Sequence, residues 1–140
     1  MKYLGMDYGS KTLGISISDE TGVFASPYKT LFYKNNEELI KEVEKIVNEE
    51  KIDEIVLGNP LNLDGSLSDR SKETLLFKSE LEKLNLKINL WDERLTTVEA
   101  EKILLNNNTK KKKKKNINDT VAAVIILQSY LDRKEKNGRS

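Results

Sequence analysis

The sequence predicts an α/β protein with a mixed, five-stranded sheet and helices on both of its faces. Near the N-terminus, three short apolar runs are joined by tight turns, which is typical of an antiparallel meander. From residue 36 onward, helical stripes alternate with short apolar runs, which is the pattern of strands connected by helices. For a chain of 140 residues, one domain over the whole length is the expectation.

The first three elements are expected to be strands. Residues 2–8 are apolar with little alternation, so this strand should be buried on both faces. Residues 13–18 alternate between apolar and small side chains after a turn at residues 9–12. Residues 23–31 can form a third strand, in which Pro27 favours an edge position or a bulge.

Helices and strands are then expected to alternate. Residues 36–50 carry an apolar stripe on a charged helix, and residues 55–57 form a short strand that ends at Gly58-Asn59-Pro60. Ser68 or Asp69 can cap a helix that extends to about residue 84. Residues 87–91 are the last expected strand.

The C-terminal third is expected to contain two helices around a polar loop. Thr96 and Glu99 form a capping box for a helix that ends near residue 105. Residues 106–116 are a flexible basic loop. The final helix starts near Asp119 and must be well buried, because residues 121–127 are apolar on nearly every side.

Composition excludes several kinds of chemistry. The chain has no cysteine and no histidine, which excludes disulfides, thiol nucleophiles, Cys/His zinc sites and Ser-His-Asp catalysis. The remaining carboxylates suit Mg²⁺ or Mn²⁺. No apolar run approaches the ~20 residues of a membrane span, and no signal peptide is visible, so we expect a cytoplasmic protein.

Acidic residues lie at the ends of three apolar segments. Asp7 ends the first strand, Asp92 and Glu93 follow the last one, and Asp119 opens the final helix. If the first and last strands are neighbours, Asp7 and Glu93 share one edge of the sheet, where α/β proteins bind their ligands. A helix across that edge could add Asp119. Clustered carboxylates repel one another unless a cation neutralises them.

Each acid also has an ordinary structural interpretation. Asp7 precedes a turn, and Asp119 is favoured by the dipole of the helix that it opens. Asp92 and Glu93 could form a solvated strand end. Position alone therefore leaves both interpretations open.

Four stretches of sequence match a known family in the family's order. They are GMDYGSKTLGISISD (5–19), VLGNPLNLDGSLSDRS (56–71), LWDERLTTVEAEKIL (90–104) and INDTVAAVIILQSYLD (117–132). With these motifs, the chain resembles the YqgF family, also called RuvX, the pre-16S rRNA nucleases with a ribonuclease H-like fold. The third stretch is the most specific of the four.

The resemblance implies that Asp7, Glu93 and Asp119 are the catalytic, metal-binding acids. It further implies phosphodiester hydrolysis by a two-metal mechanism with Mg²⁺ or Mn²⁺. Asp92 would be a neighbour, because its side chain points to the opposite face of the strand. The implied partner is nucleic acid, namely an rRNA precursor that is free or ribosome-bound. The implied role is maturation of the 5′ end of pre-16S rRNA.

Three positions depart from the family pattern. Thr12 stands where the family often has Arg, so one positive group near the first acid is missing. Asn59 replaces a usual apolar residue before Pro60. Residues 115–119 read Lys-Asn-Ile-Asn-Asp in place of a Lys-Gly-Lys stretch before the last acid. These differences concern substrate contacts more than the chemistry.

Candidate contacts to nucleic acid lie near the acids and in a lysine run. The glycine turn after Asp7 lets a phosphate approach the backbone. Arg94 could contact the scissile phosphate or form a structural salt bridge, and the lysine run could be a solvated loop or a basic arm on phosphates. The candidate residues are Gly9, Ser10, Lys11, Asn62, Arg94, Lys110, Lys111, Lys112, Lys113, Lys114 and Lys115.

Other functions compete with rRNA processing. Holliday-junction resolution would require two active sites and predicts a homodimer, whereas we expect a monomer or a weak homodimer. A non-catalytic RNA-binding ribosome assembly factor is the alternative from another class. The opening motif also looks like the first phosphate loop of sugar kinases and actin-like ATPases, but these need two such domains, for which 140 residues are too few.

Overall fold

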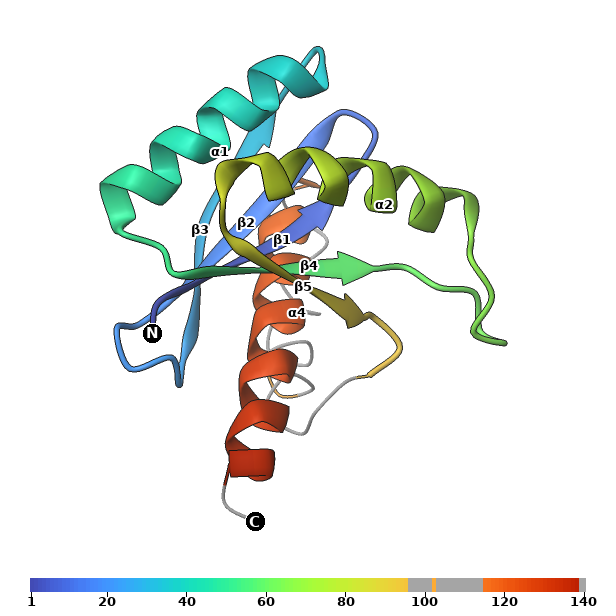
Figure 1. The fold of residues 1–140 in the computed structure, drawn as a ribbon. Helices are drawn as coiled ribbons and strands as arrows, with labels where there is room; N and C mark the ends of the chain where they lie inside the picture. Colours follow the sequence, from blue (N-terminus) through green and yellow to red (C-terminus); the bar gives the residue numbers. More distant parts are fainter. Residues whose placement is uncertain (96–101, 103–114, 139–140) are drawn as a thin grey trace.

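The sheet is mixed and five-stranded in the order β3-β2-β1-β4-β5 in the part of the chain that is described (Figure 1). The computed structural model describes residues 1–95, 102 and 115–138. The strands are β1 (Tyr3–Tyr8), β2 (Thr12–Ser18), β3 (Ala25–Phe32), β4 (Glu54–Asn59) and β5 (Lys87–Asp92). The helices are α1 (Asn36–Glu50), α2 (Asp69–Leu81), the 3₁₀ turn η1 (Glu82–Leu84) and α4 (Lys115–Gly138).

The topology confirms the predicted meander and corrects one neighbour relation. β1 pairs antiparallel with β2, and β2 with β3, whereas β1, β4 and β5 are mutually parallel. β1 and β5 are not neighbours, because the crossover through α1 places β4 beside β1 and the crossover through α2 places β5 one position further out. The carboxyl ends of all three parallel strands nevertheless meet at one edge.

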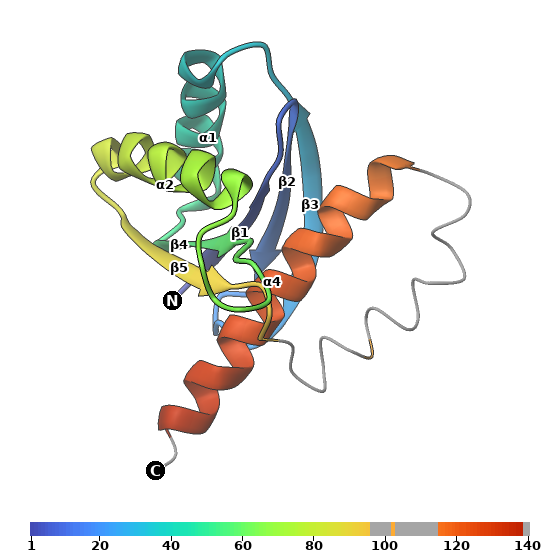
Figure 2. The ribbon, with the colours of Figure 1, turned by 90° about the vertical axis from the view of Figure 1, so that its right-hand side faces the viewer.

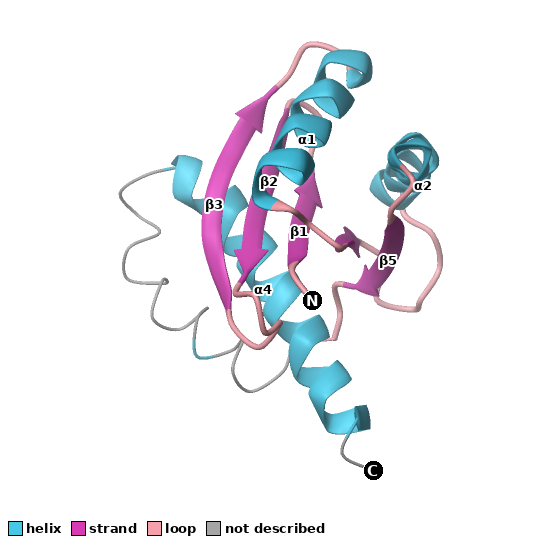
Figure 3. Cartoon of the chain, turned by 60° about the vertical axis from the view of Figure 1, so that its left-hand side comes forward, coloured by secondary structure: helices cyan, strands magenta, loops and turns pink. Residues whose placement is uncertain are grey.

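β3 is an edge strand, as Pro27 predicted (Figure 3). Its register with β2 shifts at this point, since Ile15 pairs with Lys29 whereas Ser16 pairs with Pro27. Tyr28 is therefore an extra residue on β3, which makes the irregularity a bulge. Proline has no N–H to donate. It is tolerated here because an edge strand pairs with a neighbour on one side only.

Helices cover both faces of the sheet (Figure 2). Alternate residues of β1 point to opposite faces. Leu4 and Met6 join the core beneath α1 and α2, whereas Tyr3 packs with Ile126, Leu127 and other residues of the α4 side.

α4 lies directly on the sheet at Gly5. A Cβ at this position would lie 2.7 Å from the Cβ of Leu127 and 3.0 Å from the carbonyl oxygen of Ala123. The Oγ of Ser16 donates to the same carbonyl at 2.7 Å. The missing side chain at Gly5 therefore sets how closely the helix approaches the strands.

One predicted helix boundary is wrong. α4 begins at Lys115 and not near Asp119, so Lys115 and Asn116 belong to the helix and not to the predicted loop. Lysine has a good helix propensity, and Asp119 is an interior residue rather than a cap. The second helix reaches its predicted end at Leu84, but its last turn, η1, is a 3₁₀ turn that follows α2 at Leu81 and ends where Asn85 adopts a left-handed conformation.

The remaining boundaries need few changes. Ser68, one of the two predicted caps, accepts a hydrogen bond from the Ser71 amide at 3.0 Å. The predicted burial of residues 121–127 is confirmed in large part, with Leu127 fully buried. Of the helix predicted from Thr96 to about residue 105, only residue 102 lies within the described residues, where it is helical. Among the described helices, none is long and apolar enough to cross a membrane.

Candidate functional site

Asp7 and Glu93 lie at the edge where β1, β4 and β5 end. Asp7 follows Met6, which pairs with Leu57, so Asp7 is level with Gly58 on β4. A Cβ at Gly58 would lie 3.1 Å from Oε2 of Glu93 and would clash with Ile126 of α4. The carboxylate of Glu93 therefore occupies the space above Gly58, on the α4 face and beside β1.

Glu93 is held in place by the backbone of the neighbouring strand. Its amide donates to the carbonyl oxygen of Asn59 at 3.2 Å. Its side chain lines a pocket of about 160 Å³ between the end of β5 and α4, where Trp91 and Ile126 are further lining residues. The acid is thus attached to the rigid sheet and open to this pocket.

The charge of Glu93 is costly in this position. Burial, followed by the nearby Asp7 carboxylate, raises the pKa of Glu93 to about 7, and the Arg70 guanidinium partly opposes this shift. Oε2 of Glu93 is buried and has no hydrogen-bond partner. A cation that prefers oxygen ligands would be coordinated by Oε2 and would relieve the repulsion between the two carboxylates.

The metal-free protein is expected to lose stability as the pH rises from about 5 to about 8. The unfolded chain releases the Glu93 proton near the ordinary pKa of 4.5, whereas the folded chain keeps it to about 7. The stabilisation is therefore complete below pH 4.5 and is lost through pH 7. Because the side chain is only partly buried, we expect a loss of about 1 kcal/mol, or ~4 °C in Tm.

The measurement is the Tm of the metal-free wild type against that of Glu93→Gln over this pH range. The variant cannot ionise, so the difference between the two curves isolates Glu93. Parallel curves would show that the Glu93 carboxyl titrates normally in the folded protein.

Arg70 is a site residue to which the sequence alone does not point. Its Nη2 lies 3.7 Å from Oδ1 of Asp7 and donates to the carbonyl oxygen of Tyr8 at 3.2 Å. It therefore places a positive charge beside Asp7. Its sequence signal is its place in the first turn of a helix that follows the Gly-Asn-Pro segment at the same edge.

Asn59 is a second residue whose place the sequence does not predict. It is 9% exposed, and its Oδ1 is buried without a hydrogen-bond partner. Asn59 pairs with Asp92 and, like Leu57, points to the face opposite Glu93. A polar side chain at the end of an apolar strand is its only signal.

The backbone of Asp119 lies close to the cross-strand row of the sheet that contains Asp7. Asp7 pairs with Gly14, and Gly14 pairs with Thr30 on β3. The Oγ1 atoms of Thr30 and Thr120 are 2.8 Å apart, and Asp119 directly precedes Thr120 in α4. The described side chains include those of Asp7 and Glu93. Among them, no group of three or more acidic, histidine or cysteine side chains is placed so that it could hold a metal ion.

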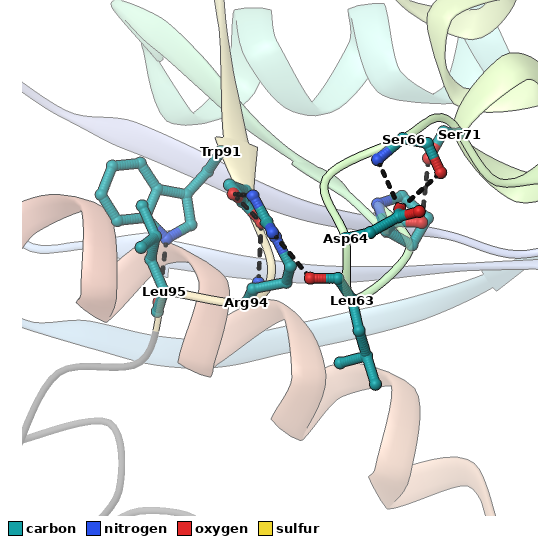
Figure 4. Close-up of polar contacts among 9 residues, drawn as sticks. Leu63, Asp64, Ser66, Ser71, Trp91, Arg94 and Leu95 are labelled. Carbon is teal, nitrogen blue, oxygen red and sulfur yellow. Dashed lines mark hydrogen bonds and ion pairs between the residues drawn. The ribbon is translucent and has the colours of Figure 1, made fainter.

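Asp92 and Arg94 form an ion pair at the other face of β5. Figure 4 shows Arg94 beside the loop that carries Leu63. Nη2 of Arg94 lies 2.7 Å from Oδ2 of Asp92, and Nη1 donates to the carbonyl oxygen of Leu63 at 3.1 Å. This geometry favours the structural interpretation of Arg94, whereas its contact with a phosphate stays a prediction. The expected opposite orientation of Asp92 and Glu93 agrees with the pairing of Asp92 and Asn59.

The other candidate contacts fall into three groups. Gly9 donates its amide to Thr12 at 2.8 Å and closes the turn after Asp7, in which Ser10 and Lys11 are exposed. Asn62 donates to Ser66 Oγ at 2.9 Å and so stabilises its own loop. The lysine run at 110–114 lies outside the described residues, and Lys115 is placed only as a residue of α4.

Comparisons with known proteins agree with the motifs and with the fold. The family model described as RuvX, Holliday junction resolvase, matches residues 1–133. A protein of Lachnospira eligens named "Putative pre-16S rRNA nuclease" is 39% identical over 97% of this chain and 100% of its own length. A Clostridium tetani protein of the same name is 45% identical over 94% and 96%.

Solved structures share the fold at low sequence identity. T. thermophilus RuvC in complex with a Holliday junction substrate superposes with a TM-score of 0.59 and 10% identity, over 96% of each chain. Because so few residues are shared, this likeness shows the fold alone.

Proposed function

Because this chain belongs to the RuvX family, we propose that it is a nuclease. It hydrolyses phosphodiester bonds at the 5′ end of a 16S rRNA precursor. The observation that carries the proposal is the pair formed by Asp7 and Glu93. A bound cation would relieve the repulsion between these two carboxylates and would satisfy the buried oxygen of Glu93 that lacks a partner.

Asp7, Glu93 and Asp119 are the residues that would hold Mg²⁺ or Mn²⁺. All three offer carboxylate oxygens, which these hard cations prefer. When bound, a pair of such ions activates water and stabilises the leaving oxygen. Attachment of Asp7 and Glu93 to the strands keeps their carboxylates in fixed positions.

The other residues of this edge can neutralise charge and contact the substrate. Arg70 neutralises some of the Asp7 charge, and its side chain is 57% exposed, so it can also face a phosphate. Lys11 and the backbone of the Gly9 turn lie directly after Asp7 and can meet the nucleic-acid backbone. Water is the nucleophile, and no histidine is needed to activate it.

The test is cleavage of a 5′-extended 16S rRNA precursor by the wild-type protein. The precursor is supplied free and ribosome-bound, with Mg²⁺, with Mn²⁺ and with EDTA. Metal-dependent shortening of the 5′ end supports the proposal. Tight binding of the RNA without cleavage in any buffer would instead indicate an assembly factor.

Holliday-junction resolution is the second candidate, favoured by the description of the matching family as a Holliday junction resolvase. Symmetric cleavage of a four-way junction needs two active sites, so it requires a homodimer. The same protein is therefore incubated with a four-way DNA junction, and its mass is measured by light scattering. Paired incisions by a dimer, without shortening of the RNA, would favour this function.

A further inference from the structure

The turn that follows Asp7 is held from outside by Tyr33. This residue comes directly after β3, and its hydroxyl donates a hydrogen bond to the carbonyl oxygen of Gly9. Its amide donates to the carbonyl oxygen of Lys11 at 3.2 Å. One residue therefore binds both ends of the turn over residues 9–11.

The ring of Tyr33 is fixed by stacking. It lies against the ring of Tyr8 with the two centroids 5.9 Å apart, and Tyr8 in turn stacks on Phe77 of α2 with centroids 4.2 Å apart. The Tyr8 hydroxyl donates to Oδ1 of Asn36, the first residue of α1, at 2.9 Å. Because Phe77 is fully buried, this row of three rings connects the turn to the core beneath α1 and α2.

The hydroxyl of Tyr33 is not needed for the stack. A phenylalanine ring would stack equally well, whereas a hydroxyl taken out of water is costly unless it keeps a hydrogen bond. Burial raises the pKa of the Tyr33 hydroxyl above its ordinary value, so the group remains a donor near neutral pH. Since its acceptor is the carbonyl of Gly9, the hydroxyl acts on the turn and not on the core.

The turn itself lies at the candidate site. Gly9 is two residues after Asp7, and Ser10 and Lys11 are exposed. Within the part of the chain that the structure describes, no carboxylate forms an ion pair with the Lys11 ammonium. This ammonium is therefore available to a phosphate, but its place depends on a turn that begins with glycine, the residue with the freest backbone.

We propose that Tyr33 is a positioning residue that holds the turn 9–11 so that Lys11 meets a phosphate of the RNA beside Asp7. The inference rests on the proposed nuclease function and deepens it. Fixing the backbone of the turn before the RNA arrives removes part of the conformational entropy that binding would otherwise cost. Tyr33 acts on the RNA only through Gly9 and Lys11.

The test compares Tyr33→Phe with the unchanged Tyr33. The substitution removes the hydroxyl and keeps the stacked ring, so the variant should fold. Binding of a 5′-extended 16S rRNA fragment is measured by fluorescence anisotropy at several salt concentrations, in an Asp7→Asn background so that no cleavage intervenes. Hydrogen exchange of the Gly9 amide is followed by NMR without RNA, and cleavage is measured separately with Asp7 intact.

Tyr28→Phe is the matched control. Tyr28 lies on β3, and its hydroxyl donates to Oε2 of Glu50 at 3.2 Å, at the opposite end of α1 from Asn36. The control therefore removes a hydrogen-bonded hydroxyl close to Tyr33 in the chain but away from the turn.

We expect Tyr33→Phe to bind the RNA about fivefold more weakly and its Gly9 amide to exchange about fivefold faster, as the loss of one neutral hydrogen bond implies. The slope of log K against log salt should fall in magnitude by about 0.7, the value for one phosphate contact on a single strand. Lys11→Gln should show the same slope. The double variant should bind no more weakly than Lys11→Gln, because Tyr33 acts through this lysine. Tyr28→Phe should leave all of these quantities unchanged.

Unchanged exchange of the Gly9 amide, or losses of affinity that multiply in the double variant, would overturn the inference. An unchanged affinity and salt dependence in Tyr33→Phe would overturn it as well, although cleavage of the precursor would still support the nuclease. If the protein with Asp7 intact cleaves no RNA but its affinity depends jointly on Tyr33 and Lys11, the proposed nuclease function fails and the positioning role stands.

Discussion

Replacing Asp7 with asparagine is expected to lower the rate of metal-dependent RNA cleavage by about 10³-fold or more. A bound metal ion contributes several kcal/mol to stabilisation of the transition state, and each ~1.4 kcal/mol is a factor of ten in rate. Asparagine keeps the size of the side chain but removes the negative charge that we propose holds the cation. The measurement is single-turnover cleavage of the 16S precursor in saturating Mg²⁺.

The same variant should fold at least as well as wild type. Asp7 is the second largest cause of the raised pKa of Glu93, so its removal relieves a repulsion in the metal-free protein. Its contact with Arg70 is long, at 3.7 Å, and the Arg70 side chain is 57% exposed, so this ion pair contributes little. We therefore expect an unchanged or higher Tm together with the loss of activity.

Asp69→Asn is the matched control for this variant. Asp69 lies one residue before Arg70 and is exposed, so this substitution makes the same change of charge away from the two acids. It should retain activity close to wild type. Equal activity of Asp7→Asn and Asp69→Asn would show that Asp7 holds no catalytic metal ion.

Gly5→Ala is expected to lower the free energy of unfolding by about 1–3 kcal/mol, the usual cost of overfilling a packed core. The added methyl group would meet Ser16 Oγ at 2.3 Å, the Cβ of Leu127 at 2.7 Å and a backbone carbonyl at 3.0 Å. A Cβ atom and a backbone oxygen cannot rotate away, so α4 has to move. Urea unfolding of the variant and of wild type gives the energy.

Displacement of α4 should also reduce catalysis, because Asp119 lies on this helix. Cleavage by Gly5→Ala is then expected to fall at a temperature at which the variant remains folded. A stability and a rate equal to those of wild type would mean that α4 does not rest on Gly5.

Periodicity and turn chemistry were sufficient to predict most of the elements. The helix over residues 36–50 follows from one apolar stripe, and the edge position of β3 follows from Pro27, because proline cannot donate to a second ladder. The order of the strands could not be predicted in this way. The separation of β1 and β5 depends on where each crossover lands, and no local pattern records that.

The same distinction applies to the candidate site. Asp7 and the pair Asp92 and Glu93 could be singled out in advance because they lie at the ends of strands, where α/β sheets bind ligands. The resemblance to the family, and not position, selected Glu93 over Asp92. Arg70 could not be singled out in advance, because its contact with Asp7 joins residues of α2 and β1 that approach only in the folded chain. The salt bridge of Arg94 likewise could not be predicted, because it was recognised only from the distance between Arg94 and Asp92 in the folded chain.

The placement of α4 has a consequence for the way the protein is made. The bond between Ser16 and Ala123 joins residues 107 positions apart, and every strand precedes this helix in the chain. During translation, the sheet therefore emerges before α4, and closing so long a loop is a late step of folding. A nascent chain that ends before residue 119 carries Asp7 and Glu93 but lacks Asp119, so the proposed nuclease has its three acids together only after α4 has been made and packed on the sheet.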